Sequence, residues 1–468
     1  MERLRRIEDL PGPRGLPLLG SALDIESTTL HLTAERWARE YGEYFRFRVG
    51  GRQFVVLANP ETIGTVLRDR PDGFNRTPRL SAIARDLGFA GLLSVNGEAW
   101  RRQRTMVMAS FDPGHIKSYF PTLTKVTERF ARRWQRAARA GEAIDLQADL
   151  MRYTVDVTAG LAFGVDMNTV ESHDEVIQAH LDKVLPALFR RLMSPLPYWR
   201  WLRFPGERRL GVHLEALQRA VTGFIAEARL RMNENPELRE EPSNLIEAMI
   251  AARDDPASGL TDTDVAGNVL TMLLAGEDTT ANTLAWMIYL FDRNRAVLQR
   301  AAAEVRGVLG EDHQPRSYEQ LARMSFLEAC ANETMRLKPV APINTVEAAR
   351  DTVVAGIHIP KGTLVMCLMR PGAVDERRFA DAAAFKPERW LSGEGTTSAK
   401  RVSMPFGAGP RLCPGRYLAM LEIKMVAAML LGGFEINAVT TPDGGEAAER
   451  LALTMSPVGL RLFLHERS

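Results

Sequence analysis

One short loop holds the residues with the clearest chemical meaning. Between Pro405 and Gly415 the chain alternates glycine and proline with other residues around Cys413, so its backbone can come close to a flat ligand. Cys413 also lies just before a predicted helix, Arg416 to Leu431, and a helix N-terminus favours the thiolate form of cysteine. The loop therefore offers a metal ligand. The alternative is a buried structural cysteine beside a turn.

A polar group interrupts the most apolar part of the sequence. Residues 275–280, Ala-Gly-Glu-Asp-Thr-Thr, lie inside a helix predicted from Asp264 onward, with leucines on both sides. Because burying unpaired polar groups is costly, this interruption needs a reason. One reason is structural: the Thr279 hydroxyl can bond back to the Ala275 carbonyl, and Gly276 weakens that turn of the helix.

Two further pairs of residues have helical spacing. Glu333 and Arg336 stand three residues apart, which in isolation indicates a solvated ion pair worth about 0.2–0.5 kcal/mol. Trp100 and Arg104 stand one helical turn apart, and in isolation they indicate a packed tryptophan beside an exposed arginine. Spacing alone gives neither pair a function.

The cysteine loop resembles, at every fixed position, the haem-binding signature F-x-x-G-x-R-x-C-x-G of the cytochrome P-450 superfamily of haem-thiolate monooxygenases. The resemblance implies that Cys413 is the proximal iron ligand of haem b, that Phe406 shields its sulfur and that Arg411 pairs with a haem propionate. Gly407 and Gly415 belong to the same cofactor-binding loop. A thiolate ligand raises the electron density at iron and favours cleavage of the O–O bond.

The polar group in the long helix is similar to the oxygen-activating motif A/G-G-x-D/E-T of the same superfamily. The similarity implies catalytic roles for three residues. Gly276 leaves room for bound oxygen, Thr279 holds that oxygen and a water molecule, and Asp278 relays protons from solvent.

The two helical pairs also have counterparts in the superfamily. Glu333 and Arg336 match E-x-x-R, which implies a buried charge network with Arg389 that stabilises the core behind the haem. Trp100 and Arg104 match W-x-x-x-R, which implies contacts to the haem propionates.

The chain departs from the family pattern at one propionate contact. Many members carry a further propionate arginine shortly after E-x-x-R, and the corresponding window here reads Asn344-Thr345-Val346. That contact is therefore absent or supplied from elsewhere.

By the same analogy the substrate pocket is mainly apolar, which predicts an apolar substrate. The alternative is that these residues pack in the core, as most apolar helix residues do. The predicted lining residues are Phe89, Leu188, Met272, Ala275, Val340, Ile343, Asn344 and Met455.

The elements that must position these residues are mostly helices with a minor sheet component. No linker-like stretch divides the sequence, and we expect one cytochrome P-450 domain over residues 1–468, with a proline-rich segment at 1–20 and the cysteine loop at 400–416. The resemblance implies a helix-rich part and a small β-rich part, with haem between the long central helix and the helix after the cysteine loop.

Alternating apolar residues and turn signals predict three strand pairs. The first is a hairpin from Phe45 to Leu57 around Gly50-Gly51. The second pairs residues 352–359 with residues 363–369, and the third pairs residues 451–455 with residues 459–463.

Composition narrows the compartment and the partners. Lys and Arg total 60 against 58 Asp and Glu, a net charge of +2 that favours no nucleic-acid partner. Three scattered cysteines favour a reducing, cytoplasmic setting, and no apolar run reaches the roughly 18–20 residues of a transmembrane anchor.

The chain ends soon after the last predicted strand pair, so electrons are expected from a separate ferredoxin or flavodoxin/reductase. This chain is predicted to present a basic face to that donor. The residues of this face are Arg101, Arg102, Arg132, Arg133, Arg416 and Lys424.

Together these features predict a haem-thiolate monooxygenase that uses O2 and two electrons to insert one oxygen atom into an apolar organic substrate, by hydroxylation or epoxidation. Two alternatives also keep Cys413, namely a haem-thiolate peroxygenase or isomerase and a non-catalytic haem sensor. The acid–alcohol pair of Asp278 and Thr279 argues against both, because neither needs a comparable proton supply.

Overall fold

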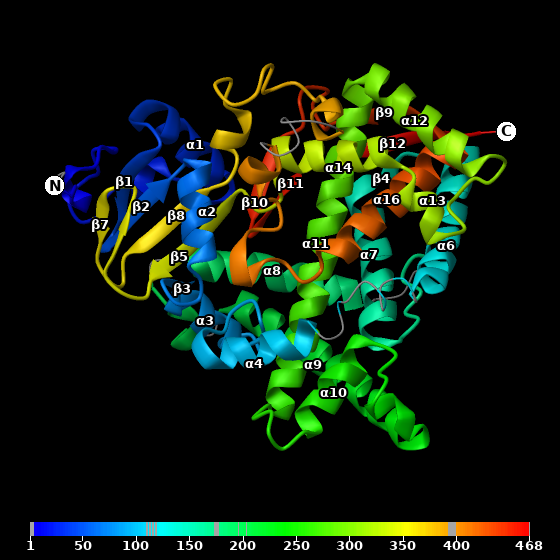
Figure 1. Cartoon of the computed structure of the whole chain (residues 1–468), viewed down its shortest axis with the longest axis horizontal. Coiled ribbons are helices and arrows are strands. Elements are labelled where there is room, and N and C mark those ends of the chain that lie inside the picture. Colours follow the sequence, from blue (N-terminus) through cyan, green and yellow to red (C-terminus); the bar gives the residue numbers. More distant parts are fainter. Residues whose placement is uncertain are drawn as a thin grey trace.

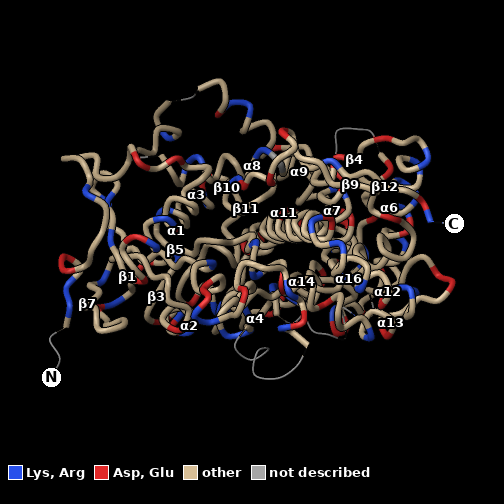
Figure 2. Tube along the Cα trace, turned by 90° about the horizontal axis from the view of Figure 1, so that it is seen from above, with Lys and Arg blue, Asp and Glu red and all other residues tan. Residues whose placement is uncertain are grey.

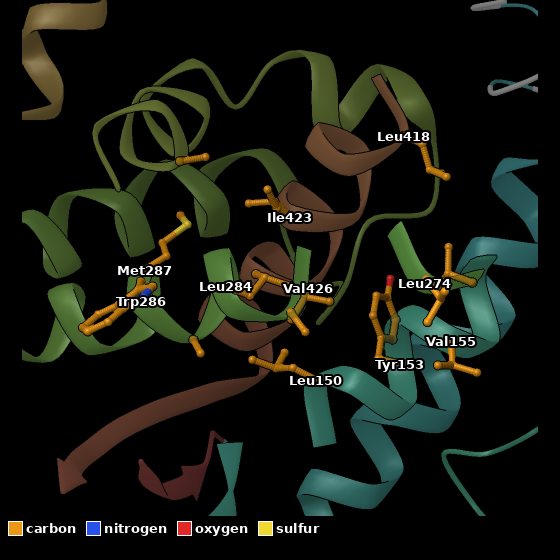
Figure 3. Close-up of a cluster of buried hydrophobic side chains, with 14 of the residues drawn as sticks. Leu150, Tyr153, Val155, Leu274, Leu284, Trp286, Met287, Leu418, Ile423 and Val426 are labelled. Carbon is orange, nitrogen blue, oxygen red and sulfur yellow. The ribbon is translucent and has the colours of Figure 1, made fainter. Parts of the chain in front are cut away.

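In the computed structural model, one long helix through the centre of the molecule organises the fold (Figures 1 and 2). The structure describes residues 4–108, 111, 114, 117, 119–172, 177–194, 196–202, 204–391 and 399–467. The central helix, α11 (Asp262–Arg293), begins with a capping box in which Thr261 and Asp264 satisfy each other's backbone amides. It packs against α7 (Leu146–Phe163) and α16 (Arg416–Gly433), whose apolar side chains meet those of α11 in the core (Figure 3).

The other helices surround this core and cover its ends (Figure 1). Their bounds follow capping signals in the sequence; α2, for example, starts at Pro60 because the Asn59 side chain accepts the Thr62 amide at 3.0 Å. They are α1 (Leu30–Tyr41), α2 (Pro60–Arg68), α3 (Pro78–Asp86), α4 (Gly97–Met108), α6 (Phe120–Ala140), α8 (Ile177–Met193), α9 (Pro205–Glu234), α10 (Leu245–Asp254), α12 (Arg295–Leu309), α13 (Tyr318–Ala322) and α14 (Ser325–Leu337).

The largest sheet lies at the N-terminal side of the molecule, on the left in Figure 1. Its strand order is β1-β2-β8-β5-β3, and a separate apolar cluster packs on it. The strands of the molecule are β1 (Tyr44–Val49), β2 (Arg52–Leu57), β3 (Phe74–Arg76), β4 (Ile144–Asp145), β5 (Ile343–Ala348), β6 (Thr352–Val354), β7 (Ile357–Ile359), β8 (Leu364–Leu368), β9 (Phe434–Thr440), β10 (Glu449–Ala452), β11 (Thr454–Pro457) and β12 (Arg461–Glu466).

The first predicted hairpin is confirmed as β1–β2, but the partners predicted for the other two strand pairs are wrong. Residues 352–359 fold on themselves as β6 and β7, because Ala355 and Gly356 both adopt positive φ angles (49° and 72°) and make a tight turn. β8 pairs instead with β2 and β5. In the same way β10 turns at Leu453 onto β11, while β12 pairs with β9 and β4.

The predicted fold class, mainly α with minor β, is confirmed. Figure 2 shows charged residues on many of the outer elements and few along α11. Within the part of the chain that the structure describes, none of the helices combines the length and the apolar character needed to cross a bilayer.

A buried charge network joins the N-terminal helix to the β10–β11 hairpin. Arg370, just after β8, donates to both carboxyl oxygens of Glu35 in α1 (2.9 and 2.8 Å) and to both of Glu449 (2.7 and 2.9 Å). Glu449 begins β10 and also contacts Lys338 Nζ at 2.6 Å and His31 Nε2 at 2.9 Å. Burial alone would raise the pKa of Glu449, but its hydrogen bonds and cationic neighbours outweigh burial and hold that pKa well below the usual range.

Replacing Glu449 by glutamine is expected to destabilise the protein by about 3 kcal/mol at neutral pH, because Arg370 and Lys338 lose a buried counter-charge. A carboxyl whose pKa is lowered by folding stabilises the fold above its unfolded pKa of 4.5, and this stabilisation is lost as the pH falls toward the folded value. Urea unfolding midpoints should therefore drop more steeply below about pH 5 in the wild type than in Glu449→Gln.

The matched control is Glu466→Gln, which removes a carboxylate paired with the exposed Arg139 and should cost less than about 1 kcal/mol. Parallel pH profiles for the wild type and Glu449→Gln would contradict the role given to this network.

Candidate active site

The cysteine loop folds tightly against α2. Gly407 and Gly409 have φ angles of +77° and +71°, which favour glycine. A Cβ on Gly409 would lie 2.6 Å from the Cα of Arg68 in α2, so the loop can approach the helix only with glycine at this position. The Cys413 amide donates to the Phe406 carbonyl oxygen at 3.0 Å, which closes the loop ahead of α16.

The pKa of the Cys413 thiol is raised above its usual value, because burial outweighs the neighbours that favour the thiolate. Burial raises the pKa of the thiol, while a hydrogen bond from the Gly415 amide and the charges of Arg104 and Arg416 act in the opposite direction. A metal ion at this sulfur would keep it deprotonated. The electrostatic setting is therefore compatible with a metal–thiolate bond.

Arg411, within the cysteine loop, packs against α4. The Arg411 guanidinium lies over the Trp100 ring, with its Cζ 4.6 Å from the ring centroid. Its Nη2 donates to the Val95 carbonyl at 2.8 Å and to Asn96 Oδ1 at 3.1 Å, whereas its Nε is buried without a partner. Arg104 follows one turn after Trp100 in α4, and burial lowers the pKa of its guanidinium.

Two more arginines, which the sequence did not reveal, lie close to Arg411: Arg70 is buried and Arg76 is half-buried. Arg76 in β3 donates from Nη1 to Asn344 Oδ1 at 3.1 Å, and its Nε is buried without a partner. Arg70 is 2% exposed, and neither its Nε nor its Nη1 has a partner. Burial, together with repulsion from Arg70 and Arg411, lowers the pKa of Arg76 to about 9.

These four residues, Arg70, Arg76, Arg104 and Arg411, form an arginine cluster that lacks a counter-charge. Burial and the charges of Arg70 and Arg104 also lower the pKa of Arg411 to about 9. No carboxylate of the described ranges forms an ion pair with any of the four. Buried like charges with unused donors are unfavourable unless a ligand brings negative charge. The two propionates of haem fit this requirement, and they fit it beside Cys413.

α11 is buried along almost its whole length except at its polar interruption. Ala275 is exposed and Thr279 is half-buried, whereas residues 267–274 and 280–292 are buried. The Thr279 hydroxyl donates to the Ala275 carbonyl oxygen at 2.9 Å, the back-bond that spacing alone suggests. This turn therefore presents an alcohol and an exposed surface within an otherwise buried helix.

Gly276 and Asp278 have contacts away from that exposed turn. A Cβ on Gly276 would lie 2.5 Å from Thr158 Oγ1 in α7, so close packing of α7 is a sufficient reason for glycine here. Asp278 accepts hydrogen bonds from Asn282 Nδ2 at 2.7 Å and from the Thr454 hydroxyl. Burial raises the pKa of Asp278 in spite of these two donors, so this carboxyl takes up a proton more readily than an exposed aspartate.

A second buried acid near α11 was not predicted from the sequence. Glu422 in α16 is 1% exposed and shares a hydrogen bond with Thr280. Burial raises the pKa of Glu422 well above its usual range, so this carboxyl holds a proton more readily than an exposed glutamate. It places a second proton-carrying group next to the polar interruption.

Glu333 and Arg336 lie in the core, which excludes the solvated-pair alternative. Arg336 donates to both Glu333 oxygens at 2.8 and 2.7 Å. Glu333 also accepts from Arg389 Nε at 3.0 Å, Trp390 Nε1 at 2.8 Å and the Lys386 amide at 3.0 Å. The remaining Arg336 donors reach three carbonyl oxygens, those of Ala373, Ala382 and Ala384.

The predicted pocket residues divide into two groups. Phe89, Leu188 and Met455 are 0–1% exposed and enclosed by protein, as the core-packing alternative expects, and Met272 is 8% exposed. Accessible or half-buried positions are Ala275, Val340, Ile343 and Asn344.

Two members of the predicted basic face are not available to a partner in this structure. Lys424 is buried and paired with Glu328 at 2.9 Å, and Arg133 is held by Asp149 at 2.8 Å. Packing of α16 and α6 against their neighbours is the reason. Arg101 and Arg102 in α4 are exposed.

Comparison with known proteins places these features in a family. The chain is 28% identical to a pentalenene oxygenase from Streptomyces avermitilis over 459 residues, which covers 97% of both chains. It is 24% identical to cytochrome P450 3A6 from Oryctolagus cuniculus over 440 residues, 92% of this chain and 86% of that protein. It is 26% identical over 467 residues to the self-sufficient cytochrome P450 monooxygenase CYP505E4 from Penicillium expansum, 98% of this chain but 43% of that protein.

The family model for cytochrome P450 matches residues 10–462, a span that contains the cysteine loop, the arginine cluster and α11. Two of these relatives are an oxygenase and a monooxygenase by name. The chain therefore belongs to the cytochrome P450 family and is an oxidoreductase that incorporates oxygen into its substrate.

Proposed function

We propose that this chain is a single-domain monooxygenase that binds haem b through Cys413 and oxidises an apolar organic substrate with electrons from a separate donor protein. One oxygen atom of O2 enters the substrate. The other leaves as water, with two electrons from the donor and two protons. The observation that carries this proposal is the arginine cluster beside the cysteine loop, because its unused donors require an anionic ligand there.

Cofactor binding is assigned to two groups of residues. Cys413 ligates the iron, within a loop shaped by Phe406, Gly407 and Gly415. The arginine cluster and Trp100 hold the propionates through charge-assisted hydrogen bonds. Haem, when bound, supplies the reduction of O2 at its iron.

Proton delivery is assigned to the polar interruption of α11. Thr279 presents its hydroxyl at the exposed turn, where it can bind a small ligand or a water molecule. Asp278 is the neighbouring acid, and its raised pKa makes it a better proton acceptor than an exposed aspartate. Gly276 allows α11 to pack closely on α7 while this turn stays open.

The substrate is expected to lie along the accessible side of this turn. Ala275, Val340 and Ile343 offer apolar surface there, and Asn344 adds one polar group, although its oxygen is bound by Arg76. An apolar molecule suits such a lining. Pentalenene, which the Streptomyces relative's name gives, is a reasonable first compound for a binding screen.

Electron transfer is assigned to a donor that docks on α4. Arg101 and Arg102 are exposed on this helix, which also carries Trp100 and Arg104 beside the proposed cofactor. Exposed cations on the route to the cofactor suit an acidic ferredoxin or flavodoxin-type protein, since complementary charge speeds association.

The test is the absorption spectrum of the dithionite-reduced protein with and without carbon monoxide, measured for the wild type and Cys413→Ser. A strongly red-shifted Soret band that is present in the wild type and absent in the variant is expected, since serine removes the thiolate ligand. Cys330→Ala is the matched control, because this cysteine is fully buried and burial raises the pKa of its thiol. Its spectrum should match the wild type. An imidazole-type spectrum, or no haem at all, would disprove the assignment of Cys413.

A further inference from the structure

The hairpin β10–β11 reaches α11 with an unusually tight turn. Ala452 pairs directly with Thr454, which leaves Leu453 alone at the tip with a φ of +86°. A bulky residue rarely adopts such a conformation, so the surrounding structure must hold it.

The stem of this hairpin is firmly held. At its start, Glu449 is bound by Arg370, Lys338 and His31. At the other side of the tip, the Met455 amide donates to the Val340 carbonyl oxygen at 2.8 Å. The tip is thus fixed relative to the core from both strands.

The residue after the tip contacts the acid of α11. The Thr454 hydroxyl donates to Asp278 Oδ2, and Asn282 Nδ2 donates to Asp278 Oδ1 at 2.7 Å. The Asn282 oxygen in turn accepts from Gln147 Nε2 of α7 at 3.0 Å, which fixes the orientation of the Asn282 amide. Each carboxyl oxygen of Asp278 therefore has its own partner.

These two partners differ in what they can accept. The Asn282 nitrogen only donates, so a proton on Asp278 Oδ1 would find no acceptor there and would weaken that bond. A threonine hydroxyl both donates and accepts. When Asp278 gains a proton, the proton can sit on Oδ2 and be donated to the Thr454 oxygen, so this contact survives in both protonation states.

We propose that Thr454 is a positioning residue for proton delivery: its hydroxyl holds the Asp278 carboxyl in one orientation and makes Oδ2 the oxygen that carries the exchangeable proton. The inference rests on the proposed function, in which Asp278 exchanges protons beside Thr279. A purely structural contact between β11 and α11 is the alternative. The two alternatives differ in the amount of product that the holoenzyme forms per electron pair consumed.

The first experiment measures product formed per NADPH consumed in the holoenzyme with its reconstituted donor. Thr454→Val keeps the shape and removes the hydroxyl, and we expect a three- to tenfold lower ratio, roughly the effect of one lost proton-positioning contact, with the balance released as hydrogen peroxide. Thr454→Ser, which keeps the hydroxyl, should restore the ratio. Ser456→Ala is the matched control, since this hydroxyl in the same strand donates to the Arg450 carbonyl at the long distance of 3.5 Å and has no contact to Asp278 among the described residues.

The second experiment needs no turnover. A double-mutant cycle with Thr454→Val and Asp278→Asn in urea unfolding should show coupling of about five- to tenfold in the unfolding equilibrium constant. Additive effects would overturn the proposal, and so would a coupled pair whose loss leaves the product ratio unchanged, because Thr454 is then only structural. If the wild type showed no red-shifted carbon monoxide band, the proposed function would instead be disproved. The double-mutant cycle would still report on the contact between Thr454 and Asp278.

Discussion

Replacing Arg336 by alanine is expected to give a protein that folds poorly and is purified without haem. The Arg336 side chain is fully buried, and its guanidinium is bound by Glu333 and by three backbone carbonyls. Removing it leaves the Glu333 charge buried and those carbonyls without their donors. Breaking a buried ion pair costs about 3–5 kcal/mol, and each unsatisfied carbonyl adds about 1–3 kcal/mol. The sum approaches the whole stability of a typical protein, about 5–15 kcal/mol.

The measurement is the haem content and the circular dichroism of the purified variant. Arg336→Lys should be only partly better, because an ammonium group cannot match the planar set of five donors. Arg300→Ala is the control: Arg300 is half-exposed, pairs with Glu388 at the surface and should change stability by less than about 1 kcal/mol. A full complement of haem in Arg336→Ala would show that this network does not support the cofactor site.

Local signals in the sequence identified most of the fold that positions the site. The hairpin turn at Gly50-Gly51 and the apolar period of the long helix depend on neighbours within a few residues. Such features are fixed by backbone preference and by which face is buried. They were predicted correctly for that reason.

The strand pairs that failed depend on contacts between distant segments. Pro360-Lys361-Gly362 resembles a hairpin turn as much as Ala355-Gly356 does, and only the pairing of β8 with β2 and β5 decides between them. Similarly, no local rule predicts a turn with Leu453 alone at its tip, since this φ is unfavourable without support from the folded protein. Tertiary contacts overrode local preference in both places.

In the candidate site, too, residues marked by local spacing were predicted and residues placed by distant contacts were not. The cysteine loop and the E-x-x-R pair have fixed spacing, so the sequence alone indicated them. Arg76 lies in a strand of three residues and meets Asn344 only because β3 pairs with β5, with Arg76 opposite Val346. The missing arginine at residues 344–346 indicated that one propionate contact is absent or supplied from elsewhere, but not by which strand. Glu422 had no signal beyond its place in an apolar helix.

The arginine cluster leads to a prediction with two opposite effects. Arg76→Met keeps the length of the side chain and removes its charge, and it should make the haem-depleted protein more stable. In that form Arg76 is half-buried beside Arg70 and Arg411, with its Nε enclosed and without a partner, and desolvation and repulsion lower the pKa of its guanidinium to about 9. Well-packed apolar replacements of buried ion pairs are neutral or stabilise proteins by about 1–4 kcal/mol, and we expect the same direction for a charge that has no counter-charge. The substitution also removes the hydrogen bond to Asn344, and this loss offsets about 1 kcal/mol of the gain in stability.

The same substitution should weaken haem retention. A hydrogen bond to a charged group contributes about 1.5–3 kcal/mol, so transfer of haem to an acceptor protein should become about ten- to a hundredfold faster. Arg68→Met, an exposed change in the neighbouring α2, is the control and should alter neither quantity. If Arg76→Met instead lowered the melting temperature of the haem-depleted protein and left haem transfer unchanged, Arg76 would be a structural partner of Asn344. A stabilised haem-depleted form combined with faster haem loss is expected if the unpaired charge at residue 76 is kept for an anionic ligand.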